Sequence, residues 1–159
     1  MKSQAIILET KINAPAERCF LLSLSVDLHR KSVEWSKEEA VRGITSGLMK
    51  AGDTVTWRAK HFGIYMEMTT KIPVYERPAY FVSEMLSGPF KRIYHQHYFK
   101  AEGSSTIMTD HFDFESPLGI LGKLVDRLIL RNYMKNLLLK RNETIKTIAE
   151  SEDWKNYLT

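Results

Sequence analysis

The chain has little of several things that would point to a particular chemistry. Its 159 residues include one cysteine, Cys19, so no disulfide can form within the chain and no thiolate cluster can hold zinc or an iron–sulfur centre. No serine-elbow, phosphate-loop or dinucleotide-binding motif occurs, which leaves hydrolase, kinase and dehydrogenase functions without a sequence signature. We therefore expect neither a cofactor nor a metal ion.

Long hydrophobic runs are missing as well. No stretch approaches the roughly 20 apolar residues that span a bilayer. Residues 1–9 carry one lysine and no small-residue cleavage site, so they do not resemble a secretory signal. The sequence thus predicts no stable membrane insertion and a cytoplasmic location.

The charge is slightly basic, with 23 Lys and Arg against 19 Asp and Glu. The whole excess falls within residues 118–150, where seven basic side chains accompany three acidic ones. They are Lys123, Arg127, Arg131, Lys135, Lys140, Arg141 and Lys146, against Asp126, Glu143 and Glu150. Such a face can bind phosphate or anionic lipid, but a helix face that points to solvent is the more common meaning. Stacking aromatics do not interleave with these bases, so we expect no nucleic-acid partner.

Hydrophobic periodicity predicts an α+β chain in a single domain, residues 1–159. A strand over 5–12 ends at Asn13, which can cap a helix with Pro15 in its first turn. Residues 25–37 are expected to form a short helix and a loop. Period-two alternation predicts further strands over 39–42, 53–61, 64–74, 80–86, 93–99 and 106–114. The period then changes to about 3.6, which predicts a long amphipathic helix over 118–150 and a short tail over 151–159.

Two histidines one residue apart are the most informative feature. Side chains alternate along a strand, so His95 and His97 share one face with Ile93 and Phe99, and this apolar company marks the inner face. Residues 102–105 form a tight turn in this interpretation. The pairs predicted across it are Phe99–Met108, His97–Asp110 and His95–Phe112. An imidazole then faces a carboxylate inside an apolar wall, which is costly without a purpose or a good hydrogen bond.

A second hairpin carries a third histidine to the same face. Phe62 and Gly63 form a two-residue turn, so the predicted pairs are His61–Ile64, Ala59–Met66 and Trp57–Met68. The apolar faces of the two strands coincide in this register without adjustment, which supports it.

A strand, a helical excursion, an antiparallel meander and a closing helix together resemble the START-like or SRPBCC superfamily. That superfamily includes Bet v 1 allergens, lipid-transfer START domains and polyketide cyclases or dehydratases, and the chain is most similar to its bacterial ligand-binding members. The stretches that carry the resemblance are INAPAE (12–17), VTWRAKHFG (55–63), GPFK (88–91), HQHYF (95–99) and SPLG (116–119).

The resemblance implies a helix-grip fold, in which a curved antiparallel sheet of six to seven strands wraps around the long C-terminal helix and encloses a cavity. A cavity of this kind suits a lipid, a polyketide or another apolar molecule. The resemblance implies no particular reaction, because one fold hosts several chemistries.

Alternation along the strands assigns side chains to that cavity. The expected ligand-binding residues are Trp57, Ala59, His61, Ile64, Met66, Met68, Glu84, His95, His97, Phe99, Met108, Asp110 and Phe112. For Glu84 the assignment depends on whether the loop at 88–89 keeps the parity of the strands. Whether His29 also faces the cavity is left open.

Several roles are open for the polar residues of this group. The histidines and Asp110 can orient the polar end of a ligand, or they can satisfy only one another. Alternatively, His97 held by Asp110 acts as a general acid or base, with His95 nearby, in an enolisation, cyclisation or dehydration. Binding of a divalent metal ranks last, because a two-residue spacing in a strand is a weak ligand signature.

The sequence therefore favours a protein that binds a hydrophobic or amphipathic small molecule in an internal cavity. The alternative is a cofactor-independent cyclase or dehydratase that uses His97, Asp110 and His95. A weaker alternative is a protein-interaction module that uses the basic C-terminal helix. The ligand, the pathway and the oligomeric state are not specified.

Overall fold

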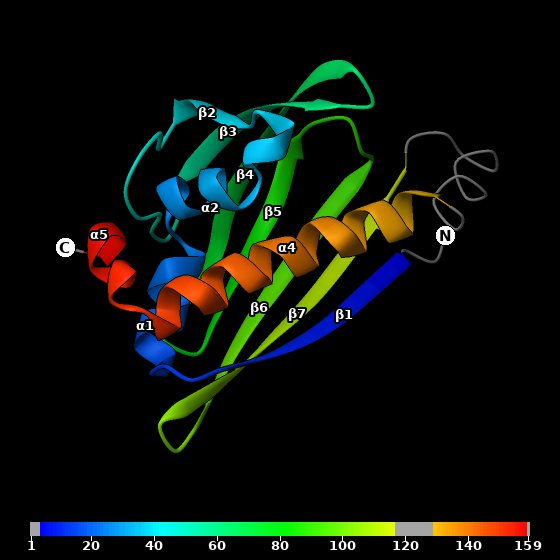
Figure 1. Cartoon of the computed structure of the whole chain (residues 1–159). Helices are drawn as coiled ribbons and strands as arrows, with labels where there is room; N and C mark the ends of the chain where they lie inside the picture. The colour runs from blue at the N-terminus through cyan, green and yellow to red at the C-terminus, as the bar shows by residue number, and fades with distance from the viewer. Residues whose placement is uncertain (1–3, 117–128, 159) are drawn as a thin grey trace.

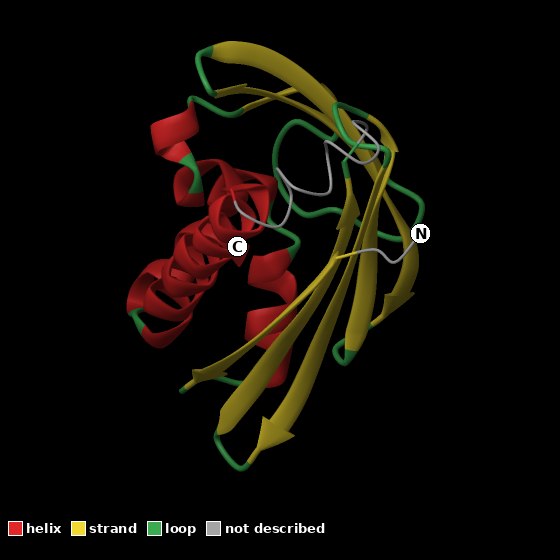
Figure 2. Ribbon diagram, turned by 90° about the vertical axis from the view of Figure 1, so that its right-hand side faces the viewer, coloured by secondary structure: helices red, strands yellow, loops and turns green. Residues whose placement is uncertain are grey.

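The polypeptide forms one curved antiparallel sheet with helices packed on its concave face (Figures 1 and 2). The computed structural model describes residues 4–116 and 129–158. The seven strands lie in the order β1, β7, β6, β5, β4, β3, β2. In chain order they are β1 Gln4–Ile12, β2 Glu39–Gly43, β3 Thr54–His61, β4 Ile64–Glu76, β5 Tyr80–Ser87, β6 Arg92–Glu102 and β7 Ser105–Glu115. The predicted helix-grip fold is confirmed.

The helices of the described residues lie on one side of the sheet (Figure 2). They are α1 Ala16–Ser23, α2 Val26–Ser32, the 3-10 turn η1 Glu34–Ser36, α4 Arg131–Glu150, η3 Glu152–Trp154 and α5 Lys155–Leu158. The long helix α4 crosses the concave face diagonally, with α1 and α2 beside its C-terminal half (Figure 1). The first part of the predicted long helix, residues 118–128, lies outside the described residues. The short tail docks, since Trp154 and Tyr157 pack against the core.

Both predicted hairpin registers are confirmed. Across β6 and β7 the structure pairs His97 with Asp110 and His95 with Phe112. Across β3 and β4 it pairs His61 with Ile64. The alternation of apolar side chains was a sufficient guide here, because a slip of one residue would turn every one of them to the other face.

The predicted helix cap at Asn13 is wrong. Pro15 occupies the N-cap position in an extended conformation, and no side chain caps α1. The side-chain oxygen of Asn13 instead accepts a hydrogen bond from Ser105 at 2.9 Å, and its backbone N–H donates to Glu150 at 2.8 Å. Asn13 therefore ties the end of β1 to the β6–β7 hairpin and to the end of α4.

Aromatic side chains fill the end of the molecule that lies under α1. The ring of Phe20 meets the rings of Tyr75, Phe81 and Phe99 edge-on, at centroid distances of 5.3, 5.5 and 5.4 Å. Edge-to-face contacts at this distance are favourable beyond the area that they bury. This end of the sheet is therefore solidly packed, and the space for a ligand lies toward the other end.

Two glycines near the connection between β2 and β3 differ in how closely other backbone atoms approach them. Gly43 pairs with Val55 at φ +76°, and a Cβ there would lie 2.2 Å from the backbone oxygen of Thr54. Gly47, at φ +78°, has open space around it. We expect Gly43→Ala to lower the free energy of unfolding by well over about 1 kcal/mol and Gly47→Ala by less, because only the first substitution meets backbone. Urea denaturation measures both values, and equal losses would contradict the close approach at Gly43.

Candidate functional site

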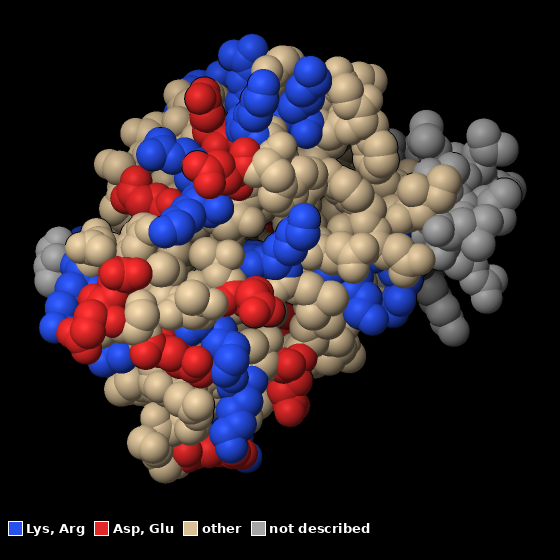
Figure 3. All heavy atoms as spheres, in the orientation of Figure 1, with Lys and Arg blue, Asp and Glu red and all other residues tan. Residues whose placement is uncertain are grey.

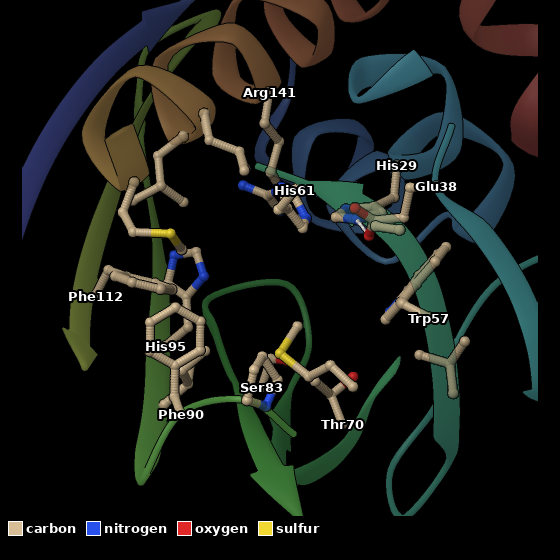
Figure 4. A pocket seen from close by; sticks show the side chains of 18 of the residues that line it. His29, Glu38, Trp57, His61, Thr70, Ser83, Phe90, His95, Phe112 and Arg141 are labelled. Atoms are coloured by element: carbon tan, nitrogen blue, oxygen red, sulfur yellow. Dashed lines mark hydrogen bonds and ion pairs between the residues drawn. The ribbon is translucent and has the colours of Figure 1, made fainter. Parts of the chain in front are cut away.

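A cavity lies between the concave face of the sheet and α4. Its volume is about 580 Å³, within the range of roughly 300–1,000 Å³ that is usual for small-molecule sites. Strands β3 to β7 supply its floor and walls, and α2 and α4 supply its roof. In Figure 4, Arg141 reaches down from α4, His95 and Phe112 lie on one side, and His29 and Trp57 lie on the other.

The structure places most of the predicted ligand-binding residues on the wall of this cavity. Those that line it are Trp57, Ala59, His61, Met66, Met68, His95, His97 and Phe112. Those that do not line it are Ile64, Glu84, Phe99, Met108 and Asp110. The structure gives the positions of these residues, and their role in binding stays a prediction.

The predicted residues that do not line the cavity lie elsewhere for physical reasons. Phe99 and Met108 face inward, but Phe20 and α1 cover them. Ile64 sits at the tip of the β3–β4 hairpin and is 61% exposed. Ser83 pairs with His95 and lines the cavity, so the next residue, Glu84, lies on the other face of the sheet.

Asp110 lies directly behind the cavity wall, at the centre of a buried polar cluster. We use "polar cluster" for His95, His97, Asp110, Arg141 and Asn142. His95 donates from Nε2 to Oδ1 of Asp110 at 2.7 Å, and Asn142 donates from Nδ2 to Oδ2 at 2.6 Å. The Arg141 guanidinium lies 3.6 Å from Oδ1. Both oxygens of the carboxylate are thus engaged, which offsets the cost of burying it.

The histidine that Asp110 holds is not the one expected. The register pairs His97 with Asp110, as predicted, but the hydrogen bond comes from His95. Nδ1 of His97 lies 3.2 Å from the same oxygen without hydrogen-bond geometry, and it is fully buried. The His97 ring stacks on Phe81 at 4.1 Å and lies 3.7 Å from the ring of His95. Asp110 therefore orients the imidazole of His95, whereas the sequence predicted that of His97.

Burial sets the charges of the polar cluster. Burial alone would raise the pKa of Asp110, but the hydrogen bonds and charges around it hold that pKa well below its ordinary value. Burial lowers the pKa of His95, and burial with the neighbouring His95 ring holds the pKa of His97 well below its ordinary value. Burial also lowers the pKa of Arg141, although a guanidinium stays protonated in proteins. At neutral pH the cluster is one carboxylate, one guanidinium and two neutral imidazoles.

Sequence reasoning placed Arg141 on a solvated helix face, and this is wrong. Its side chain is 7% exposed and points into the cavity (Figure 4). The signal was present, because Arg141 lies three residues after Leu138 and four before Ile145, which is the spacing of the buried stripe. Asn142 lies four residues after Leu138 and three before Ile145, which also fits the spacing of the buried stripe. A charged residue that has the spacing of the buried stripe is therefore expected to point toward the interior.

A second hydrogen-bonded pair faces the cavity across from the polar cluster. Nε2 of His29 lies 2.8 Å from Oε1 of Glu38, and the His29 ring packs at 4.4 Å on the indole of Trp57. Glu38 is 8% exposed. The sequence left His29 open, and the structure places it on the cavity wall.

Tyr133 joins the sheet to α4 near the β3–β4 hairpin. Its hydroxyl lies 2.5 Å from Nδ1 of His61, and its ring lies 4.9 Å from Phe62 and 6.1 Å from Trp35. Burial lowers the pKa of His61. Tyr133 was missed from the sequence, because an amphipathic pattern does not say which strand its helix will meet.

The polar cluster includes three residues that could in principle ligate a metal. One ligand atom from each of His95, His97 and Asp110 lies within 4.8 Å of the others. However, both oxygens of Asp110 already accept hydrogen bonds, and the positive Arg141 lies 3.6 Å away. A divalent cation here would displace these bonds and face a fixed positive charge, so we assign none to the cluster.

The face that carries α4 bears charges of both signs among the described residues. Basic and acidic side chains of the described residues are interspersed there (Figure 3). Among the basic residues predicted for the long helix, Arg141 is buried, and Lys123 and Arg127 lie outside the described residues. No helix in the described part of the chain is both long and apolar enough to span a membrane. The cytoplasmic location stays a prediction.

Solved structures share this fold, whereas no family model and no curated protein matches the chain. A protein of Thermus thermophilus is 19% identical with a TM-score of 0.71, over 92% of this chain and 99% of that one. A START superfamily protein of Mycobacterium smegmatis is 13% identical (TM-score 0.67; 92% and 98% covered). An aromatase/cyclase of a Streptomyces species is 11% identical (TM-score 0.65; 92% and 96% covered). These likenesses confirm the predicted START-like fold and carry no residue roles.

The buried histidines predict how stability depends on pH. The pKa values of His95 and His97 are lower in the folded protein than in the unfolded chain. As the pH falls through about 6.5, the unfolded chain therefore binds more protons than the folded protein, and this favours unfolding. We expect the free energy of unfolding in urea to fall between pH 7.5 and 5.5. In His97→Gln that fall should be smaller by about 1 kcal/mol. Asp110 adds nothing in this window, because its own contribution is lost only below its ordinary pKa of 3.8.

A matched control is His111→Gln, since His111 lies outside the cavity, against the ring of Tyr98. This variant leaves the polar cluster intact and controls for the replacement of a histidine by glutamine. A full wild-type dependence in His97→Gln would contradict the assignment of a neutral His97.

Proposed function

We propose that the protein binds a hydrophobic or amphipathic small molecule in this cavity, for carriage or sequestration. Lipids and polyketide-like compounds are the classes that suit it. The observation that carries the proposal is a cavity of about 580 Å³ whose lining is largely apolar and includes the balanced polar cluster. An apolar body with a single polar group would satisfy both parts.

The character of the wall supports this proposal. Met66, Met68 and Met134 line the cavity, and unbranched thioethers adapt to ligands of different shape. Ala59 and Ser83 are small, which leaves the floor of the cavity open. Neighbours of the same fold bear names that include a START superfamily protein and an aromatase/cyclase, which is consistent with small-molecule binding.

Filling the cavity should weaken binding of a ligand. Ala59 is 5% exposed and lines the cavity, so the indole in Ala59→Trp would occupy ligand space. We expect N-phenyl-1-naphthylamine, a neutral fluorescent probe, to bind the wild type and to bind Ala59→Trp at least about tenfold more weakly, a loss of about 1.4 kcal/mol. Ala101→Trp, at an exposed position on β6, is the matched control and should bind like the wild type. Undiminished binding by Ala59→Trp, or no binding by the wild type, would contradict the proposal.

Acid–base catalysis in the same cavity is a second candidate function, and one observation favours it. The His95 imidazole lines the cavity and is held at 2.7 Å by a buried carboxylate, which is how a general base is oriented. The reaction class would be enolisation of a carbonyl ligand, leading to cyclisation or dehydration. The structure suggests His95, rather than His97, as the proton acceptor.

Hydrogen exchange tests this second candidate without knowledge of the substrate. We expect the wild type to accelerate exchange of the α-hydrogens of 1-tetralone in D₂O, followed by NMR, because enolisation is the step that a base at His95 would promote. His95→Gln should lower the accelerated rate by about 10² or more, and His111→Gln should leave it unchanged. An exchange rate equal to that of the buffer would count against the enzyme.

A further inference from the structure

The hydrogen bonds around Asp110 fix the tautomer of His95. Oδ2 of Asp110 accepts from the amide of Asn142, and the Arg141 guanidinium lies 3.6 Å from Oδ1, so the carboxyl group is ionised and has no proton to give to His95. Nε2 of His95 must therefore carry the hydrogen. In the neutral imidazole the other nitrogen, Nδ1, is then an acceptor, and no side chain of the described residues occupies it.

Arg141 presents the complementary group. It makes two hydrogen bonds, to Asn142 Oδ1 at 3.1 Å and to the backbone oxygen of Ser23 at 3.4 Å. A guanidinium has five N–H donors, and Arg141 lines the cavity, so donors remain for a ligand. The polar cluster thus offers an acceptor on His95 and donors on Arg141, and Figure 4 shows both side chains turned toward the same space.

We propose that this pair binds a hydroxyl group of the phenol or enol class, which donates to Nδ1 of His95 and accepts from Arg141. The inference rests on the proposed binding function and names the head group of the ligand. A hydroxyl is the smallest group that donates and accepts at one atom. Because a phenol or enol is acidic, its proton can pass to Nδ1 of His95, which leaves an oxyanion beside Arg141 and an imidazolium beside Asp110.

The balance of charge disfavours a carboxylate ligand. Arg141 and Asp110 already neutralise each other at 3.6 Å, so a carboxylate would leave one uncompensated negative charge in a buried site. Ionisation of a bound hydroxyl adds no net charge, because its proton stays on His95. A methyl ether could accept from Arg141 but would leave Nδ1 of His95 without a donor, which costs affinity in a desolvated site.

The other titratable groups that face the cavity do not offer the same pair. His29 and Glu38 are engaged with each other, and His61 is engaged with the Tyr133 hydroxyl. His97 lines the cavity beside His95, but its Nδ1 lies 3.2 Å from Oδ1 of Asp110 and its ring stacks on Phe81. Among the residues that the structure describes, only the polar cluster combines a free imidazole acceptor with a buried guanidinium.

Three ligands with one aromatic body test the head group. They are 7-hydroxy-4-phenylcoumarin, its 7-methoxy ether and the corresponding 7-carboxylate, titrated against the intact wild-type protein by calorimetry at pH 6.5. We expect the hydroxyl compound to bind at least about tenfold more tightly than either of the others. The bound hydroxyl compound should also be at least tenfold more ionised than the free compound at that pH, which its absorption spectrum reports.

Variants then assign the preference to the pair. Arg141→Met should abolish both the preference for the hydroxyl compound and its ionisation, and His95→Phe should do the same. Lys135→Met removes a positive charge from an exposed position of the same helix and should change neither. Circular dichroism checks that each variant is folded, and the three ligands test the proposal on the wild type if one is not.

The outcomes separate this inference from the function on which it rests. Equal affinity for the hydroxyl and methoxy compounds, or a preference for the carboxylate, would overturn the head-group assignment and leave the cavity function standing. Failure of all three compounds to bind, together with failure of the neutral probe, would overturn both.

Discussion

The buried carboxylate of Asp110 is the constraint on which the arrangement of the site depends. It lies on β7, yet its two oxygens accept hydrogen bonds from His95 on β6 and from Asn142 on α4. Such a group is costly to bury unless every acceptor position is used, so its partners are fixed in space with it. The distance between helix and sheet, and with it the depth of the cavity, follows from this one group and its neighbours.

The two halves of the helix–sheet interface use different side chains. Under α1, the rings of Phe20, Phe81 and Phe99 fill the space between the layers. Further along, small side chains such as Ala59 and Ser83 cannot reach α4, and a cavity is left. Close packing of apolar side chains normally eliminates such voids, because an unfilled space forfeits contacts. An apolar space of about 580 Å³ is therefore a feature that a ligand would complete.

The sequence predicted the strand pairing well, because the information is local. Two hairpin turns and an alternation of period two were enough to set His97 against Asp110 and His61 against Ile64. Contacts between the sheet and the helices could not be predicted in the same way. Phe99 has the parity of a cavity residue, but α1 covers it. His95 takes the hydrogen bond that the pairing assigned to His97, since twist of the strands decides which of two rings on one face meets a side chain.

For Arg141, the residue type and the position in the sequence predict opposite degrees of burial. A charge count treats it as part of a basic surface, whereas its spacing from Leu138 and Ile145 places it on the buried stripe. The contradiction between residue type and position is itself informative, because a guanidinium is placed in an interior only where something compensates it. Solved structures that share this fold at 11–19% identity carry different names, so function must reside in residues of this kind. In this chain the proposed head-group preference depends on this compensated charge, because it is a polar group on an otherwise largely apolar cavity wall.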